Sequence, residues 1–384
     1  MTSREDKLWP TPVLWNGNRA QFFRGNRERL RSGGWDFLML SRHFDEIQLD
    51  GRLQHVFPHM LAHLGRGGFE PTQQVTWHQQ GNKELAPGMQ YMPCGLNLPM
   101  APANVRDSEE FQMWDEVLQQ AAQKRAFVTW AKNNGLIGLM PETLPFDANE
   151  LPVIPPDFGL GWVKDAESEV TGKTNVHGPF EGEQLMAAAV DFSGEGLAYQ
   201  VQQHVDGVDI SNQYLVVRKN GESTLHFLGT TEQVVLEEED GAHHAGNRWR
   251  PAVGDCGWMT HAIAQKLVAQ GLQGFFGIDA RVDGLTGRVT EPNLRTNGSS
   301  AALALGLMNG FDDGLLIRES PVNPSLSLDQ LFGRIERSGL EFRPGIGGVI
   351  VHTVGYVEQG TLGLTAYGPD AQAMFDEMSA ILNR

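Results

Sequence analysis

Two carboxylates in the last third of the sequence have the spacing of a metal site. Asp279 and Glu291 lie on either side of a Gly-containing turn at residues 283–287. If the flanking segments form a hairpin, each strand brings one carboxylate to the same point, and Asn293 projects to the same side as Glu291. Carboxylate and amide oxygens are ligands that Mg²⁺ prefers, usually completed by water and nucleotide phosphates. We therefore predict a metal site at these three residues; a surface hairpin with solvated charges is the alternative.

An arginine and two upstream lysines extend this pattern. Arg295, two residues beyond Asn293, would place a fixed cation beside bound phosphates. The series D-x-R … E-x-N-x-R, which follows a strand-rich segment, resembles the C-terminal metal motif of the ATP-grasp superfamily of carboxylate–amine ligases. Lys124, within Gln-Lys-Arg, is similar to the first nucleotide-binding lysine of that family. Lys164, within Trp-Val-Lys, is similar to the second, which contacts the phosphates.

The segment 166–178 corresponds to the flexible phosphate-covering loop of the same family. It contains Ser168, Thr171 and Lys173, which the resemblance implies as nucleotide contacts. The loop has fewer glycines than is typical of the family. Its closure would exclude the water that hydrolyses an acyl phosphate.

The segment 201–209 resembles the adenine-contacting linker. The resemblance implies that backbone groups of Gln203 and Val205 pair with adenine and that Asp209 holds the ribose hydroxyls. Gln202 stands where the family normally has Glu, and Asp209 replaces a more usual Glu. Both side chains keep oxygen acceptors, but Gln202 cannot carry a negative charge.

The resemblance implies an α/β and α+β fold, the ATP-grasp fold, in three parts. Residues 1–123 would form an N-terminal pre-ATP-grasp α/β domain, and residues 124–319 the nucleotide- and metal-binding region. Residues 320–384 would form a small C-terminal α/β extension. The matching motifs cover roughly residues 123–310. The tail around 348–363 also looks like the C-terminal domain of peptide ligases of the pheganomycin-pathway type.

The resemblance also implies a reaction. A substrate carboxylate attacks the γ-phosphorus of ATP to give an acyl phosphate and ADP, and an amine then attacks the acyl carbon. Lys124 and Lys164 would bind phosphates, Lys164 and Arg295 would act in catalysis, and Mg²⁺ or Mn²⁺ would be the metal. We expect amide or peptide bond formation in specialised metabolism, such as antibiotic biosynthesis. Two alternatives remain open: a different acceptor, such as a thiol or a phosphorylated purine intermediate, and a nucleotide-binding regulator without catalysis.

The elements that must position these residues follow from hydrophobic periodicity. A helix beginning at Asp107 and stopping at Gly135, with a break near Lys124, would carry the first lysine. Proline-containing stretches near 152–156 and 320–327 read as linkers. The remaining predicted strands are 13–15, 36–40, 161–164, 197–205, 210–217, 225–228, those flanking 283–287, 349–356 and 362–367. Further expectations are irregular structure at 71–104, a solvated loop at 236–250, a helix at 255–270 and a closing helix begun by Pro369.

Composition restricts the partners. The net charge of −17 comes from 30 Lys+Arg against 47 Asp+Glu, which would repel nucleic acid and anionic lipid. The two cysteines are far apart, which suits a reducing cytoplasm. Residues 1–10 contain no apolar signal segment, and no apolar run is long enough for a membrane helix. We expect a cytoplasmic protein that acts on a small-molecule carboxylate and amine, with a homodimer left open.

Two features near the strand-rich centre have more than one interpretation. His243 and His244 are adjacent in an acidic stretch, where histidines face water more often than they bind zinc. Arg248 and Arg250 could present cations to a substrate carboxylate, or they could belong to an ordinary loop.

Overall fold

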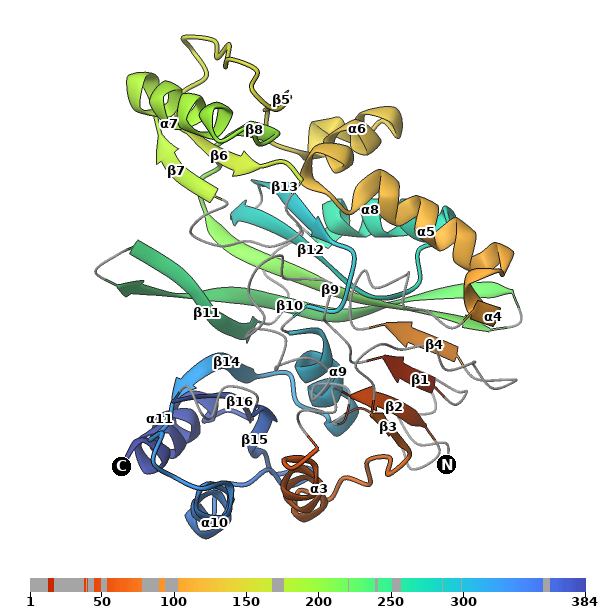
Figure 1. The fold of residues 1–384 in the computed structure, drawn as a ribbon, viewed down its shortest axis with the longest axis vertical. Coiled ribbons are helices and arrows are strands. Elements are labelled where there is room, and N and C mark those ends of the chain that lie inside the picture. The colour runs from red at the N-terminus through yellow and green to blue at the C-terminus, as the bar shows by residue number, and fades with distance from the viewer. Residues whose placement is uncertain are drawn as a thin grey trace.

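The computed structural model places three sheets with helices around them (Figure 1). No described helix is long and apolar enough to cross a membrane. The structure describes residues 13–16, 38, 40, 45–49, 54–77, 90–93, 103–167, 176–219, 221–238, 241–250, 257–284, 286–297, 299–354 and 360–384.

The N-terminal sheet is parallel, with strand order β3-β2-β1-β4. Its elements are β1 (Val13–Asn16), β2 (Glu46–Leu49), α3 (Phe57–Arg66), β3 (Val75–Trp77) and β4 (Gln90–Pro93). The predicted strand at 36–40 is wrong, because Leu38 and Leu40 are helical and fully buried. A short apolar run fits a buried helix as well as a strand. The stretch 71–104, expected to be irregular, contains β3 and β4.

Two consecutive helices carry the chain from the N-terminal sheet toward the site. α5 (Glu109–Ala121) is capped by Ser108, whose Oγ accepts from the Phe111 amide at 3.2 Å, so the predicted cap at Asp107 is one residue too early. The break expected near Lys124 is confirmed, because α6 (Lys124–Asn133) begins at that residue. Gly135 follows with φ +72°, a conformation that favours glycine. Lys124 therefore lies at the start of a helix.

A small antiparallel sheet with one covering helix forms the upper lobe in Figure 1. Its strand order is β5-β8-β6-β7. Leu185 and Phe192 of the helix pack with Val163 and Tyr199 of the strands in one buried cluster. The elements are β5 (Thr143–Phe146), which follows the short helix η4 (Ile137–Leu139), and then β6 (Gly161–Asp165), β7 (Val176–Phe180), α7 (Gly182–Gly194) and β8 (Tyr199–Gln203).

The large sheet has eight strands in the order β13-β12-β9-β10-β11-β14-β16-β15, counted over the described residues. It joins the predicted metal hairpin at one edge to the C-terminal strands at the other. Its strands are β9 (Val208–Lys219), β10 (Glu222–Glu238), β11 (Gly241–Arg250), β12 (Gly274–Asp283), β13 (Thr286–Asn293), β14 (Gly314–Pro321), β15 (Gly348–Thr353) and β16 (Thr361–Tyr367). Its helices are α8 (Gly257–Ala269), α9 (Ser300–Asn309), α10 (Leu328–Ser338) and α11 (Ala371–Asn383).

The structure corrects three expectations for this sheet. Residues 236–250, expected to be a solvated loop, form the end of β10 and all of β11. The predicted linker at 320–327 begins inside β14. Pro369 precedes the N-cap of α11, Asp370, so it does not occupy the first helical position. Long antiparallel strands can keep one face toward water and therefore contain many polar residues, so the sequence pattern of 236–250 was that of a loop.

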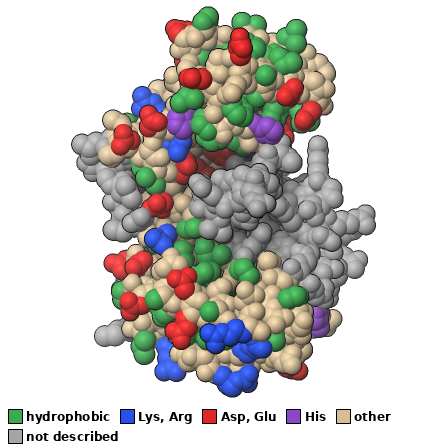
Figure 2. Space-filling model, turned by 90° about the vertical axis from the view of Figure 1, so that its left-hand side faces the viewer, with side chains coloured by type: hydrophobic (Ala, Val, Ile, Leu, Met, Phe, Trp, Pro, Cys, Tyr) green, Lys and Arg blue, Asp and Glu red, His purple; other side chains and the backbone are tan. Residues whose placement is uncertain are grey.

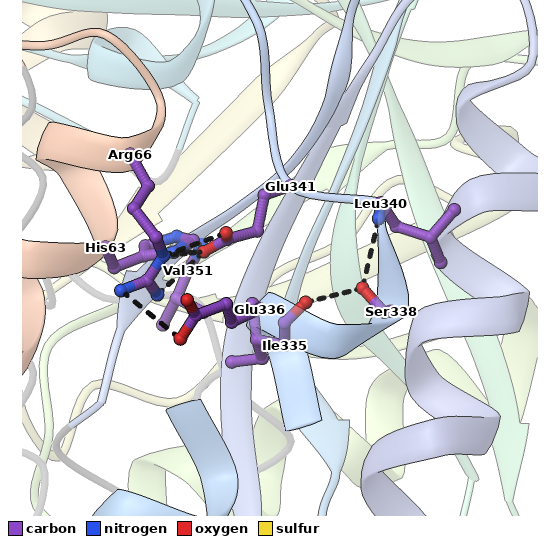
Figure 3. A network of polar contacts seen from close by, with 8 residues as sticks. All are labelled: His63, Arg66, Ile335, Glu336, Ser338, Leu340, Glu341 and Val351. Atoms are coloured by element: carbon purple, nitrogen blue, oxygen red, sulfur yellow. Dashed lines mark hydrogen bonds and ion pairs between the residues drawn. The ribbon is translucent and has the colours of Figure 1, made fainter. Parts of the chain in front are cut away.

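The N-terminal helix α3 packs against the C-terminal elements through polar contacts (Figure 3). His63 Nδ1 lies 2.7 Å from Glu341 Oε1, and His63 Nε2 accepts from the Val351 amide at 3.0 Å. Arg66 donates to both Glu341 oxygens through Nε, at 3.1 and 2.9 Å. Residues that are far apart in sequence thereby fix the N-terminal block to the C-terminal strands.

Candidate nucleotide and metal site

The predicted metal hairpin forms as expected, with its two carboxylates opposite each other. Asp279 and Glu291 are direct partners across β12 and β13, and a bulge follows Asp279. Ser211 Oγ donates to Asp279 Oδ1 at 2.5 Å, and Asn293 Nδ2 lies 2.8 Å from Asp279 Oδ2. Glu291 is only 7% exposed. The structure therefore brings Asp279, Glu291 and Asn293 to one point.

The electrostatics of this pair fit a divalent cation. Burial, and then the charge of Glu291, raises the pKa of Asp279 to about 7, which Ser211 and Arg295 partly oppose. A bound metal ion would offset the repulsion between the two negative charges of these carboxylates. Among the described residues, no group of three or more His, Cys, Asp or Glu could hold a metal. Mg²⁺ at this point would therefore take two carboxylates and an amide, with phosphates and water as its other ligands.

Both predicted phosphate lysines lie beside the carboxylates. Lys124 Nζ is 3.6 Å from Glu291 Oε2, and both side chains are buried. Burial lowers the pKa of Lys164, and Lys124 lowers it further, while Glu291 opposes the shift. Two cations thus face two carboxylates inside one small volume. Such a balanced cluster can accept the charges of a metal–nucleotide complex.

Gln202 has a structural role that the sequence did not indicate. Its side chain is 1% exposed, and Oε1 accepts from Lys164 Nζ at 2.7 Å. Its Nε2 lies 3.3 Å from Thr143 Oγ1 and 3.4 Å from the Thr290 carbonyl oxygen. The bond to Thr290 joins the small sheet to β13. A glutamate here could not donate to the Thr290 carbonyl, which accounts for the amide at this position.

The segment that is predicted to contact adenine begins at the end of β8. The Gln203 amide donates to the Glu142 carbonyl at 2.8 Å, and the His204 amide donates to the Leu160 carbonyl at 2.8 Å. Within the described part of the chain, the Val205 amide has no hydrogen-bond partner. Of the two residues predicted to pair with adenine, Val205 therefore has a backbone donor available, while the amide of Gln203 is already used.

Asp209 is paired with a residue to which the sequence assigned no role. Arg281 Nε lies 3.0 Å from Asp209 Oδ1. Burial raises the pKa of Asp209, and Arg281 opposes this shift. Arg281 follows Asp279 by two residues on β12, so both project from one face of the strand. This spacing, already present in the D-x-R motif, was a signal that could have placed Arg281 in the site.

Most of the predicted residues line a cavity of about 170 Å³ between the small sheet and the large sheet, but Lys124 and Asn293 do not. A neighbouring hollow of about 580 Å³ shares Gln203 and Val205 with it. On the face shown in Figure 2, acidic, basic and histidine side chains gather below the upper lobe. The cavity is lined by Trp162, Lys164, Val176, Gln202, Gln203, Val205, Asp209, Ile210, Gln233, Asp279, Arg281, Thr290 and Glu291.

Other predicted residues are not among those that line the cavity. Ser168, Thr171 and Lys173 fall outside the described residues. Arg295 is half-buried and does not line the cavity, although its charge lowers the pKa of Asp279. The suggested substrate role of Arg248 is not supported, because its guanidinium bonds Gln372 on α11. Gln233 lines the cavity and was not predicted from the sequence.

Comparisons with known proteins identify the fold. Neither family models nor curated sequences give a match. An L-amino acid ligase from Bacillus licheniformis is similar in structure, with a TM-score of 0.52, 12% identity, and coverage of 97% of this chain and 98% of that chain. An N5-carboxyaminoimidazole synthetase from Staphylococcus aureus is similar with a TM-score of 0.51, 9% identity, and coverage of 97% and 98%. The same synthetase complexed with ADP gives a TM-score of 0.51 at 10% identity.

At these identities the comparisons concern the fold. They span nearly the whole of each chain, and they agree with the series of motifs from Lys124 to Arg295. The protein therefore has the ATP-grasp fold.

Proposed function

We propose that this protein is an ATP-dependent, ADP-forming ligase that activates a carboxylate as an acyl phosphate and joins it to an amine. One observation carries the proposal. Asp279 and Glu291 face each other across a hairpin, with Lys164 lining the same cavity and Lys124 3.6 Å from Glu291. These are the groups that phosphoryl transfer from a metal–nucleotide complex requires.

Each residue of the site has a role in this proposal that follows from its position. Lys124 and Lys164 bind phosphates, and their partial burial strengthens each interaction relative to water. Asp279, Glu291 and Asn293 would hold Mg²⁺ or Mn²⁺, which would neutralise phosphate charge. Val205 donates its free amide to adenine, and Asp209 accepts from the ribose. Ser168, Thr171 and Lys173 belong, in this proposal, to a loop that covers the phosphates.

The reaction has two steps, and neither of them forms a covalent bond to the enzyme. A carboxylate oxygen of the substrate attacks the γ-phosphorus, and the bond to the β-phosphate oxygen breaks to release ADP. The amine then attacks the acyl carbon, loses a proton, and displaces inorganic phosphate. Arg295, in the bend that follows β13, stabilises the acyl phosphate and the oxyanion of the second step.

The acceptor is proposed to be the amine of an amino acid or small peptide. The likeness to an L-amino acid ligase and the pheganomycin-type character of residues 348–363 support this choice. A role in specialised metabolism, such as antibiotic biosynthesis, belongs to the same proposal, as does the division at residues 123/124 and 319/320. The equal likeness to an N5-carboxyaminoimidazole synthetase supports a second candidate, an ATP-grasp enzyme with a different acceptor.

A substrate screen separates these candidates. Amino acids are offered in pairs, and separately with aminoimidazole ribonucleotide and bicarbonate, in the presence of ATP and Mg²⁺. Phosphate release and product mass are then measured. We expect a condensed product from at least one amino-acid pair and a loss of about 100-fold or more in Glu291→Gln. The ligase proposal fails if no combination releases phosphate above background and Glu291→Gln behaves like the wild type.

A further inference from the structure

The Arg281 guanidinium contacts three residues of the segment 204–209. Its Nη2 donates to the Gly207 carbonyl oxygen at 3.0 Å. Its Nε lies 3.0 Å from Asp209 Oδ1, and its Nη1 lies 3.3 Å from His204 Nδ1. One side chain on β12 thereby holds the stretch of chain that leads from β8 into β9.

His204 is fixed from two sides. The Trp162 indole Nε1 donates to His204 Nδ1 at 3.0 Å, and Arg281 approaches the same nitrogen. Because both neighbours are donors, Nδ1 is the acceptor and Nε2 carries the proton. That proton faces Asp206, whose Oδ1 is 3.4 Å from Nε2. The histidine therefore has one preferred tautomer and orientation, which depends on Arg281.

Arg281 also orients the carboxylate of Asp209, which lines the cavity. Arg281 and Asp209 are direct partners across β12 and β9, and both line the cavity that contains Lys164 and Asp279. The contact is an ion pair to Oδ1 of Asp209, in which the Arg281 Nε–H is not aligned for a hydrogen bond. The second oxygen, Oδ2, has no hydrogen bond to any residue that the structure describes. Arg281 thus fixes Asp209 while leaving one of its oxygens able to accept a hydrogen bond from a ligand.

We propose that Arg281 is a positioning residue that fixes Asp209 and the linker for recognition of the nucleotide sugar. It thereby sets the preference for a sugar that carries hydroxyl groups. The inference rests on the proposed function, because it requires a nucleotide in this cavity. The Arg281 guanidinium is held at three points of the segment 204–209, which includes the residue proposed to bind the ribose. We therefore expect its substitution to change binding of the sugar rather than binding of the phosphates.

Binding of two nucleotides tests this role without knowledge of the substrates. Calorimetry measures the Kd of Mg·ADP and of Mg·2′,3′-dideoxy-ADP for the full chain. We expect the wild type to prefer ADP by about tenfold or more, the value of a hydrogen bond to a charged acceptor. Arg281→Gln is expected to weaken ADP binding by about tenfold while leaving dideoxy-ADP nearly unchanged, so that the preference disappears.

Arg218→Gln is the matched control. Arg218 is 21% exposed, against 20% for Arg281, and it also pairs with a carboxylate, Glu110, at 3.3 Å. It does not line the cavity, so both Kd values should stay at the wild-type level. Arg281→Lys, which keeps the charge but cannot make all three contacts, should give an intermediate preference.

The inference is overturned if Arg281→Gln and Arg281→Lys keep the wild-type preference. It is also overturned if either variant weakens ADP and dideoxy-ADP equally, since that result would place Arg281 on the phosphates. If the wild type binds neither nucleotide, the proposed function itself is contradicted. Nucleotide binding with an unchanged preference in the variants contradicts this inference alone.

Discussion

Asp279 and Glu291 are direct cross-strand partners, and burial together with the charge of Glu291 raises the pKa of Asp279 to about 7. The pair therefore holds a proton near neutral pH when no cation is bound. A metal ion bound by this pair, as we propose, would displace that proton, so metal binding and proton release would be coupled at this site.

Mg²⁺-dependent nucleotide binding should accordingly weaken as the pH falls below 7. Asp279 is protonated on that side of its pKa, and a metal ligand must be deprotonated, so the affinity should fall by up to about tenfold per pH unit. Titrations of Mg·ADP at pH 6, 7 and 8, in buffers of different ionisation enthalpy, would detect the released proton. An affinity that is constant from pH 6 to pH 8 would contradict this coupling.

Removing the charge of Lys164 should weaken nucleotide binding without weakening the fold. Burial lowers the pKa of Lys164, which means that the folded protein gains little from this charge. We expect Lys164→Met to raise the Kd for Mg·ADP by about tenfold or more, with a melting temperature close to that of the wild type, because removal of a desolvated charge offsets the lost hydrogen bond to Gln202. Lys132→Met, at an exposed position of α6, serves as the control. A lower melting temperature in Lys164→Met alone would show that the lysine is structural.

Gly277 leaves room for the side chains that support the metal ligands. A Cβ there would lie 2.4 Å from Asn297 Nδ2, 2.7 Å from Gln213 Nε2 and 3.2 Å from Ser211 Oγ. Ser211 donates to Asp279, so Gly277→Ala should disturb that ligand and lower Mg²⁺-dependent activity by about tenfold or more. Gly194→Ala, with open space around its Cβ, is the matched substitution and should leave the activity intact. Equal activities in the two variants would refute this dependence.

Glu341 should make the free energy of unfolding depend on pH in the acidic range. Burial raises the pKa of Glu341, but hydrogen bonds from His63 and Arg66 outweigh it and bring the pKa to about 2. The folded pKa is thus below the ordinary value, so the stabilisation is present above about pH 4.5 and is lost as the pH falls toward 2. At neutral pH it amounts to roughly 2–3 kcal/mol of unfolding free energy.

Urea unfolding at pH 7 and pH 3.5 measures this contribution. Glu341→Gln should reduce the stability at pH 7 and flatten its acid dependence. Glu336→Gln should behave like the wild type, because Glu336 is 59% exposed and lies 3.9 Å from Arg66. Equal effects of the two substitutions at pH 7 would contradict the role of Glu341 in joining α3 to the C-terminal strands.

The features that could be predicted from the sequence are those set by local spacing. The turn at 283–287 and the alternation along its strands predicted that Asp279 and Glu291 would meet, and the structure places them as direct partners. The break before Lys124 follows from local helix signals in the same way. The ATP-grasp fold was predicted from the order of such motifs and is confirmed by the likeness to solved structures.

Features that depend on tertiary partners could not be read from the sequence. The polar segment 236–250 resembles a loop, yet it forms strands because β11 pairs along β10 and residues 246–248 pair with β14. In the sequence, Gln202 looked like a nucleotide contact that lacks the usual negative charge. The structure shows instead that its amide nitrogen contacts Thr143 and the Thr290 carbonyl oxygen, which are distant in the sequence. Arg281 acquires its role only when β9 and the linker are folded beside β12.

The transfer of oxygen from a carboxylate to phosphate tests the central claim most directly. Amino acids labelled with ¹⁸O in the carboxylate are incubated in pairs with the protein, unlabelled ATP and Mg²⁺, and the released phosphate is analysed by mass. Activation as an acyl phosphate predicts ADP and phosphate that carries one ¹⁸O atom, with both products lost in Glu291→Gln. Unlabelled phosphate accompanying the condensed product, or AMP and pyrophosphate in place of ADP, would contradict the account.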